Sequence, residues 1–263
     1  MLGPDDPLSD DAITGSFRVW QRVRGHRYSL DDVLTAREAW RASEGRKIER
    51  ACDLGCGLGS VLLMVTWANS DVPMVGIEAQ DVSFELARRN VARNGLTDRV
   101  RLLQGDLRDP SVRERARDGA RFDLVTGTPP YVPPGRSTPS PDPQKAHARV
   151  ELRGGIEDYL EAASELVSED GVVVVCGDAR FPERAFDGAA KVGLHVRRQL
   201  DACPRAGRPP LFSVWTFTRE AGPFEKAPDF IARDASGLRT EAYFTLRTDF
   251  GLPPTHTPTV ENA

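Results

Sequence analysis

The chain has 263 residues, 40% of them hydrophobic and 28% charged, a balance typical of a globular protein that buries a sizeable core. This composition excludes wholesale disorder. The formal net charge of −4 at pH 7 excludes a uniformly basic nucleic-acid-binding chain, although a local basic face remains possible. The first residues lack a signal-peptide pattern and the apolar runs are too short to cross a bilayer, so we expect a cytoplasmic protein.

Cysteine and histidine give little support for a metal site. The four cysteines form no C-x-x-C pair and are too sparse for a disulfide scaffold, which indicates reduced core thiols. The four histidines lie far apart in the sequence, and none has the H-x-x-x-H or H-x-x-E-H spacing. We therefore expect no metal.

Short apolar runs alternate with longer amphipathic stretches, which predicts repeated strand–helix units and an α/β fold with one doubly wound, largely parallel sheet. Seven runs predict strands, at residues 48–54, 73–78, 100–104, 122–127, 172–177, 194–200 and 211–218. The intervening stretches predict helices, at residues 31–43, 58–69, 81–94, 111–118, 155–168 and 181–191.

Three stretches interrupt this alternation. Residues 18–27 form a basic segment that fits either a hairpin or a loop. Residues 132–147 contain too much proline for a helix or an inner strand and predict a long loop. From about Pro228 the pattern predicts a small hairpin, followed by a disordered tail after Leu252. The expected organisation is an N-terminal extension and helix (1–45), a central domain (46–220), and a C-terminal hairpin and tail (221–263).

A glycine-rich turn, Asp53-Leu-Gly-Cys-Gly-Leu-Gly59, follows the first predicted strand and opens an apolar helix. Gly55, Gly57 and Gly59 allow the backbone to turn tightly and to approach a ligand, while the helix start offers free N–H donors. A ligand with a negative end can bind there. An isolated turn of this kind is equally compatible with an ordinary strand–helix connection.

Two carboxylates at the ends of the next strands favour a ligand site. Glu78 ends the second strand, where a carboxylate can accept both hydrogen bonds of a ribose diol. Asp106 follows the third strand and could accept a hydrogen bond from an adenine amine. An adenosine-containing ligand fits these positions. A dinucleotide fits less well, because Ser60 replaces the last glycine of G-x-G-x-x-G and Asp53 would place a carboxylate near a pyrophosphate.

In these residues the chain resembles the class I S-adenosylmethionine-dependent methyltransferases, whose first motif is an acid followed by a G-x-G-x-G turn. The resemblance implies a Rossmann-like sheet of seven strands, mostly parallel with an antiparallel last strand. It also implies S-adenosylmethionine as cofactor, with its methionine part on the turn from Asp53 to Gly59, its ribose on Glu78 and its adenine on Asp106. Alternatively, each carboxylate could merely cap a helix.

The fourth predicted strand ends in Thr128-Pro129-Pro130-Tyr131, beside the glycine turn. Two prolines in series form a stiff segment whose carbonyls have no neighbouring N–H competing for them, although the segment could also be a plain extended loop. Its position at the end of a strand favours a site. The tetrapeptide is similar to the Asn/Asp/Ser-Pro-Pro-Tyr/Phe motif of amino methyltransferases, which act on adenine N6, cytosine N4 or glutamine N5.

That resemblance implies that Thr128 and the Pro129 carbonyl accept hydrogen bonds from the target amine, with Pro130 in the same rigid segment, and that Tyr131 stacks on the substrate. Two acceptors would localise the lone pair of the amine and aim it at the methyl group, so orientation and fixed dipoles would supply the acceleration. Thr128 departs from the motif, because a hydroxyl is shorter than a carboxamide and carries a rotating hydrogen. Activity could be lower, shifted to another amine or absent, and we favour catalysis.

Further stretches resemble the methyltransferases that modify adenine N6 in valine tRNA. They are His26 to Ala36, Ala148 to Glu151, and Thr240 to Tyr243, although that family often has histidine where this chain has Val150. The resemblance covers about residues 16–252 and implies an RNA partner, tRNA first. An RNA partner would be met by basic side chains around the mouth of the pocket, where they could contact phosphates. The same side chains could instead belong to a solvated basic pair of strands. They are Arg18, Arg22, Arg24, Arg27, Arg136 and Lys145.

The leading hypothesis is a methyltransferase that acts on adenine in tRNA or another RNA. A glutamine N5 protein methyltransferase is the nearest alternative, but it would normally carry an additional helical recognition domain. A catalytically silent cofactor-binding scaffold is a third reading that Thr128 keeps open. A reductase fits least, because of Ser60 and the lack of a proton-donor constellation.

Overall fold

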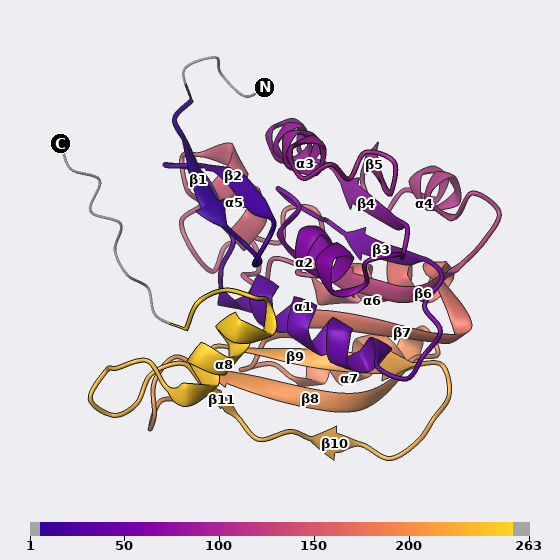
Figure 1. The fold of residues 1–263 in the computed structure, drawn as a ribbon. Helices are drawn as coiled ribbons and strands as arrows, with labels where there is room; N and C mark the ends of the chain where they lie inside the picture. Colours follow the sequence, from indigo (N-terminus) through magenta and orange to yellow (C-terminus); the bar gives the residue numbers. More distant parts are fainter. Residues whose placement is uncertain (1–5, 255–263) are drawn as a thin grey trace.

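A computed structural model describes residues 6–254, which are built around one twisted sheet with helices on both faces (Figure 1). The long strands are β3 (Ala51–Leu54), β4 (Met74–Glu78), β5 (Val100–Gln104), β6 (Phe122–Gly127), β7 (Val167–Asp178), β8 (His195–Cys203) and β9 (Phe212–Thr218). Their order across the sheet is β5-β4-β3-β6-β7-β9-β8. β9 is antiparallel to both neighbours, and the other pairs are parallel. The predicted Rossmann-like fold with an antiparallel last strand is confirmed.

Two short strands extend this sheet beyond the seven strands expected. β10 (Glu225–Lys226) and β11 (Phe230–Ile231) both pair in parallel with β8, so the sheet of the described residues has nine strands. Each is only two residues long, which is too short for the alternation of apolar and polar residues that identifies a strand in a sequence. They occupy the outer edge of β8, which would otherwise present unpaired backbone groups.

Eight helices occur in the described residues: α1 (Leu30–Ser43), α2 (Ser60–Ala68), α3 (Asp81–Arg93), α4 (Pro110–Arg117), α5 (Pro143–Arg149), α6 (Ile156–Leu166), α7 (Glu183–Lys191) and α8 (Glu241–Asp249). One buried cluster joins α1, α2, α3 and α8 to one face of the sheet. A second joins α4, α6 and α7 to the other face. Successive residues of β7, such as Val174 and Val175, enter opposite clusters, as expected for a strand covered on both faces.

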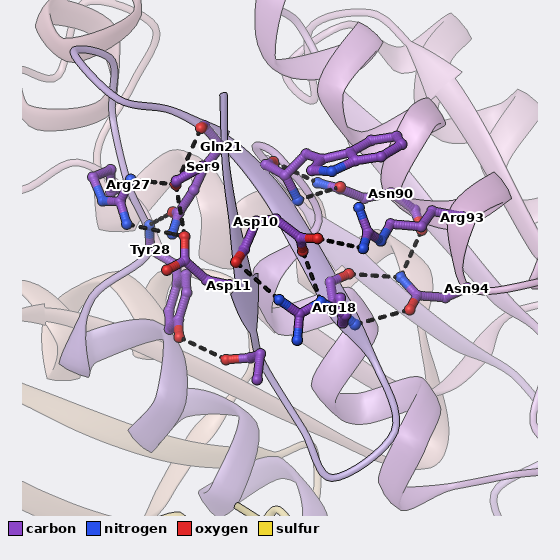
Figure 2. Close-up of polar contacts among 12 residues, drawn as sticks. Ser9, Asp10, Asp11, Arg18, Gln21, Arg27, Tyr28, Asn90, Arg93 and Asn94 are labelled. Atoms are coloured by element: carbon purple, nitrogen blue, oxygen red, sulfur yellow. Dashed lines mark hydrogen bonds and ion pairs between the residues drawn. The ribbon is translucent and has the colours of Figure 1, made fainter. Parts of the chain in front are cut away.

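The basic N-terminal segment, for which a hairpin and a loop were both open, forms a hairpin. β1 (Leu8–Ala12) and β2 (Arg18–Arg22) pair antiparallel and lie apart from the main sheet (Figure 1). The hairpin is anchored to α3 by two asparagines one helical turn apart (Figure 2). The Asn90 carboxamide bonds the backbone N–H and carbonyl of Trp20, at 2.7 and 3.0 Å, and Asn94 does the same for Arg18, at 2.9 and 2.8 Å.

At the outer edge of β2, side-chain amides therefore pair the backbone N–H and carbonyl groups of Arg18 and Trp20, which another strand would otherwise pair. The hairpin also fixes the linker that follows it. The Gln21 side chain accepts a hydrogen bond from the Tyr28 N–H at 3.1 Å, and Arg27 donates to Ser9 and Asp11 (Figure 2). The hairpin therefore holds residues 26–32 at the place where, as described below, they form one wall of the site.

The prediction for the C-terminal segment was partly wrong. A tight turn at Asp234–Gly237 is present, bridged by Arg233 and Arg239, but the chain then enters α8 in place of a second strand. The Thr240 hydroxyl accepts a hydrogen bond from the Tyr243 N–H at 3.2 Å, which caps the helix at its first turn. The tail expected to be disordered lies outside the described residues from residue 255 onward.

The proline-rich stretch also differs from its prediction. Residues 132–142 form a loop, but α5 begins at Pro143, where proline is tolerated because the first helical N–H needs no partner. Asp142 caps this helix by accepting from the Lys145 N–H at 3.1 Å. Smaller differences affect element ends: β3 begins at Ala51, not at residue 48, and β7 begins at Val167, inside the helix predicted at residues 155–168. The boundaries proposed at residues 46 and 220 stay a prediction.

None of the helices between residues 6 and 254 is long and apolar enough to cross a membrane. Over the same range no group of three or more His, Cys, Asp or Glu side chains is arranged to hold a metal ion. The four cysteines are buried free thiols.

Candidate active site

The candidate site is a cleft at the carboxyl ends of β3, β4, β5 and β6, which encloses about 800 Å³ of space including its open mouth. This is the edge of an open parallel sheet where ligands normally bind. The cleft brings together six of the predicted site residues: Gly55, Gly57, Glu78, Asp106, Thr128 and Pro130. Asp53 lies buried below the glycine turn, Gly59 caps α2, and Pro129 is buried in the chain between Thr128 and Pro130.

The glycine turn adopts backbone conformations that only glycine accepts readily. Gly55 and Gly57 have φ of 58° and Gly59 has φ of 93°, all in the left-handed region. A Cβ at Gly55 would also lie 2.1 Å from the Tyr159 hydroxyl oxygen. The predicted tight turn is therefore required both by dihedral angle and by the buried tyrosine packed against it.

Glu78 is locked onto this turn by backbone donors. Its carboxylate accepts hydrogen bonds from the Gly57 N–H at 2.8 Å and the Gln80 N–H at 2.6 Å, and the residue is only 6% exposed. Burial raises its pKa, while these N–H groups act in the opposite direction by favouring the charged form. The carboxylate is thus rigidly placed on the wall of the cleft by two backbone donors.

Asp53 provides an acceptor directly beneath the turn. Its Oδ1 accepts from the Thr126 hydroxyl at 2.7 Å, and its Oδ2 is buried without a hydrogen-bond partner among the described residues. Burial raises its pKa to about 7. An unpaired buried carboxylate oxygen is costly unless something satisfies it, and a cationic ligand end on the turn would supply that partner.

Asp106 lies at the far side of the cleft, where its carboxylate is already paired. It accepts from the Arg108 backbone N–H at 3.0 Å and forms an ion pair with the Arg108 side chain at 2.7 Å. Arg108 lowers the pKa of Asp106, so the acid stays ionised. A ligand amine would share this acceptor with arginine.

The Thr128–Tyr131 segment contacts two acids at the start of α1. Thr128 Oγ1 donates to Asp32 Oδ1 at 3.3 Å, and Tyr131 Oη donates to Asp31 Oδ2 at 3.3 Å. Thr128 faces the cleft, whereas the Tyr131 side chain lines a separate small pocket of about 230 Å³ beside Trp215. The structure therefore brings Thr128 and Pro130 into the same cleft as the glycine turn and directs the Tyr131 side chain elsewhere.

Asp32 is the main site residue that the sequence analysis missed. It lines the cleft, is 6% exposed, and accepts from the Ser29 N–H at 2.8 Å as part of the capping box of α1. Burial and the neighbouring Asp31 raise its pKa to about 8. The Ser-x-x-Asp spacing was a visible signal, but it indicates only a helix start, and nothing in the sequence shows that this helix start faces residue 128.

Several other polar side chains also line the cleft and were not singled out. They come from the linker before α1, from α5 and from the segments around it: His26, Tyr28, His147, Arg153 and Tyr159. Among the described residues, His147 Nδ1 and Arg153 Nη1 are buried without a hydrogen-bond partner. Burial lowers the pKa of both His26 and His147. These groups were unpredictable because they reach the cleft only through tertiary packing.

The hairpin arginines expected to ring the mouth are largely paired with acids. Arg18 forms an ion pair with Asp10 at 2.8 Å and Arg27 one with Asp11 at 3.0 Å (Figure 2). Arg22 bridges Asp6 and Asp142. Because nearby carboxylates neutralise their charge, Arg18, Arg22 and Arg27 fit a structural role in and around the hairpin better than contact with phosphates.

The strand order, the antiparallel β9 and the glycine turn at the head of α2 define the class of Rossmann-like methyltransferases. A family model described as a methyltransferase domain matches residues 46–190, more than half of the chain, and the chain belongs to that family. This family and this fold imply the use of S-adenosylmethionine. The residues present fit it: Gly57 leaves open space above the turn, Glu78 is fixed beside the turn, and Asp53, buried beneath the turn, has an oxygen without a hydrogen-bond partner among the described residues.

Relatives named tRNA1(Val) (adenine(37)-N6)-methyltransferase are similar over most of the chain. The protein from Bacteroides thetaiotaomicron is 27% identical over 203 residues, 77% of this chain and 81% of the relative. The protein from Escherichia fergusonii is 26% identical over 220 residues, 81% and 84% of the two chains. Among solved structures, a predicted O-methyltransferase from Agrobacterium tumefaciens has a TM-score of 0.62 at 18% identity, covering 85% of this chain and 98% of that one, a likeness of fold.

Proposed function

We propose that this protein transfers a methyl group from S-adenosylmethionine to an exocyclic amine, adenine N6 of a tRNA or another RNA. The observation that carries the proposal is the position of Thr128 in the same cleft as Gly57 and Glu78, with a buried acid behind it. The names of the relatives support adenine in tRNA as the substrate. A tRNA substrate would also agree with a cytoplasmic protein.

Asp32 resolves the difficulty raised by threonine at position 128. A free hydroxyl could turn its hydrogen toward the substrate amine and repel it. When Asp32 is ionised, that hydrogen is directed at Asp32 Oδ1, 3.3 Å away, so the lone pairs of Thr128 Oγ1 are left for an N–H of the substrate. Thr128 would thus serve as the acceptor that a carboxamide provides in the related motif, with Asp32 as its positioning residue.

The rest of the acceptor site follows from the rigid backbone. The carbonyl of Pro129 would accept the second amine hydrogen, and the rings of Pro129 and Pro130 keep this segment rigid because each fixes its own backbone dihedral φ. Bound S-adenosylmethionine supplies an electrophilic methyl group. Thr128 and Pro129 orient the amine lone pair toward that group, and the cleft walls exclude water, so acceleration comes from alignment and fixed dipoles.

We keep the proposed role of Tyr131 in stacking on the substrate, but this role requires a change in the conformation of its side chain. Its hydroxyl must leave Asp31, and the ring must turn from its small pocket toward the cleft. Substrate binding would have to favour that rotation by its own stacking energy, which is about 1–3 kcal/mol for a base on an aromatic ring.

The test is transfer of a labelled methyl group from S-adenosylmethionine to total tRNA, total rRNA and a protein extract in parallel. We expect label on tRNA, and digestion to nucleosides should show it on the N6 atom of adenine. Label on protein alone would overturn the RNA substrate and favour a glutamine acceptor. No label in any arm, with S-adenosylhomocysteine still bound, would favour a silent scaffold.

A further inference from the structure

A second cavity adjoins the cleft, and we call it the α8 groove. It encloses about 880 Å³ including its open mouth and lies between the N-terminal hairpin, α1 and α8. Figure 1 shows α8 packed beside α1, near the base of the hairpin. Arginines and tyrosines supply much of its lining, at Arg27, Tyr28, Arg239, Tyr243 and Arg247, and Leu246 and Phe250 add apolar surface.

Tyr28 lines both cavities and therefore joins them. Its hydroxyl donates to the Ala12 carbonyl at 3.3 Å, at the end of β1 (Figure 2). Burial and the charge of Asp11 raise the pKa of Tyr28, while Arg247, which lines the same groove, opposes the shift. A molecule extending out of the cleft past Tyr28 would enter the α8 groove.

The arginines of the groove differ from those of the hairpin in their partners. The guanidinium of Arg239 lies 3.9 Å from the centre of the Tyr243 ring, and Arg247 Nε donates to the Pro253 carbonyl at 3.0 Å. Within residues 6–254 neither forms an ion pair with a carboxylate, whereas Arg27 is neutralised by Asp11. The groove therefore carries two positive charges available to an anionic ligand.

This combination matches the chemistry of a single-stranded nucleotide. Unstacked RNA bases pack on aromatic rings and on arginine planes, and phosphates pair with guanidinium groups. We propose that the α8 groove binds the nucleotide next to the target base, with its phosphate on Arg239 and Arg247 and its base against Tyr243. The assignment rests on the proposed RNA substrate and extends it by naming where the flanking nucleotide lies.

The test compares the double variant Arg239→Gln/Arg247→Gln with the unaltered full-length protein. Fluorescence anisotropy with labelled oligoadenylate measures binding across about 50–200 mM salt. We expect the Kd to rise roughly tenfold or more, and the slope of log Kd against log salt to fall by about 0.7, because the contact with one phosphate of a single strand is lost. In methyl transfer to tRNA, KM should rise by a similar factor while kcat stays within about twofold.

A matched control carries the same change of charge on the other face of the sheet, Arg115→Gln/Arg121→Gln, where Arg115 lies in the last turn of α4. This variant should bind as the unaltered protein does. Tyr243→Phe should preserve the stacking contribution, and Tyr243→Ala should weaken binding roughly tenfold to a hundredfold. S-adenosylhomocysteine affinity should be unchanged in all of them, which shows that the folded cleft is intact.

The possible outcomes distinguish the proposal that the α8 groove binds a nucleotide from the proposal that the protein methylates RNA. Equal Kd, salt slope and KM in the α8 and control variants would overturn the groove while leaving methyl transfer to RNA in place. Loss of binding in the α8 variant, together with no label on any RNA, would support the groove and overturn the proposed reaction. If oligoadenylate and tRNA do not bind the unaltered protein, both proposals fail.

Discussion

The two ends of the cleft are built in different ways. At the cofactor end, Gly57 and Glu78 are fixed by backbone hydrogen bonds of 2.6–2.8 Å and by left-handed dihedral angles. At the proposed acceptor end, Thr128, and beside it Tyr131 in its separate pocket, are held by side-chain bonds of 3.3 Å to acids on another element. Backbone contacts leave few alternative geometries, whereas these long side-chain contacts can be broken by a substrate or by a change of pH. The first end is preformed and the second is adjustable.

The largest effect that would test this contrast is expected for Gly55→Ala. The new Cβ would meet the Tyr159 hydroxyl oxygen at 2.1 Å, and the φ of 58° is unfavourable for alanine. Overpacking and the dihedral penalty together should lower the free energy of unfolding by about 3 kcal/mol or more. Urea denaturation measures this loss in the free energy of unfolding.

Gly57→Ala is the control for that variant, because it shares the φ of 58° but its Cβ would approach nothing more closely than 4.0 Å. It should cost only the dihedral penalty, about 1–2 kcal/mol. Equal losses in the two variants would show that Tyr159 moves aside, and that the cofactor end is less rigid than its contacts indicate.

The next effect in size concerns Glu78→Gln. The substitution preserves shape but removes the charge that accepts from both the Gly57 and Gln80 N–H groups, and one of the two would face an amide NH₂. Hydrogen bonds to a charged acceptor contribute about 1.5–3 kcal/mol, so affinity for S-adenosylhomocysteine should fall about a hundredfold by titration calorimetry. Glu114→Gln, on the exposed face of α4, should leave it unchanged.

At the acceptor end, Thr128→Val should lower kcat about thirtyfold, because the amine loses one acceptor and Asp32 loses its donor. The affinity for S-adenosylhomocysteine should stay within about twofold, since the cofactor contacts are on other residues. Thr128→Ser keeps the hydroxyl and should retain most of the activity. If valine and serine behave alike in single-turnover methyl transfer, the hydroxyl is not the acceptor.

The same contrast explains how much the sequence could predict. The proposed cofactor end was predictable because the glycine turn from Asp53 to Gly59 and Glu78 follow or end neighbouring parallel strands. The order of the strands alone brings them together. The acceptor end joins Thr128 to Asp32, 96 positions apart, and this contact depends on how the hairpin and α1 dock on the sheet. The helix α8 was missed for a related reason, since the segment after its turn has both strand and helix character and packing against α1 decides between them.

The smallest effect is a pH dependence of stability at Asp32. In the folded chain its pKa is about 8, whereas the ordinary value is 3.8. Between these values the folded state holds a proton at Asp32 that the unfolded state has released, so stability is present at low pH and falls as pH rises toward 8. The slope from this group should be about 1 kcal/mol per pH unit.

Asp32→Asn removes that titration while preserving size, so the difference in unfolding free energy between the two proteins should shift in favour of the variant as pH rises from 6 to 8. Asp53, whose pKa burial raises to about 7, titrates in both proteins, and its charge is one cause of the raised pKa of Asp32, so the difference reports the titration of Asp32 together with its interaction with Asp53. Urea denaturation in a series of buffers measures the two curves. Parallel curves would mean that Asp32 is ionised in the folded protein throughout this range, and that its burial does not hold a proton on it.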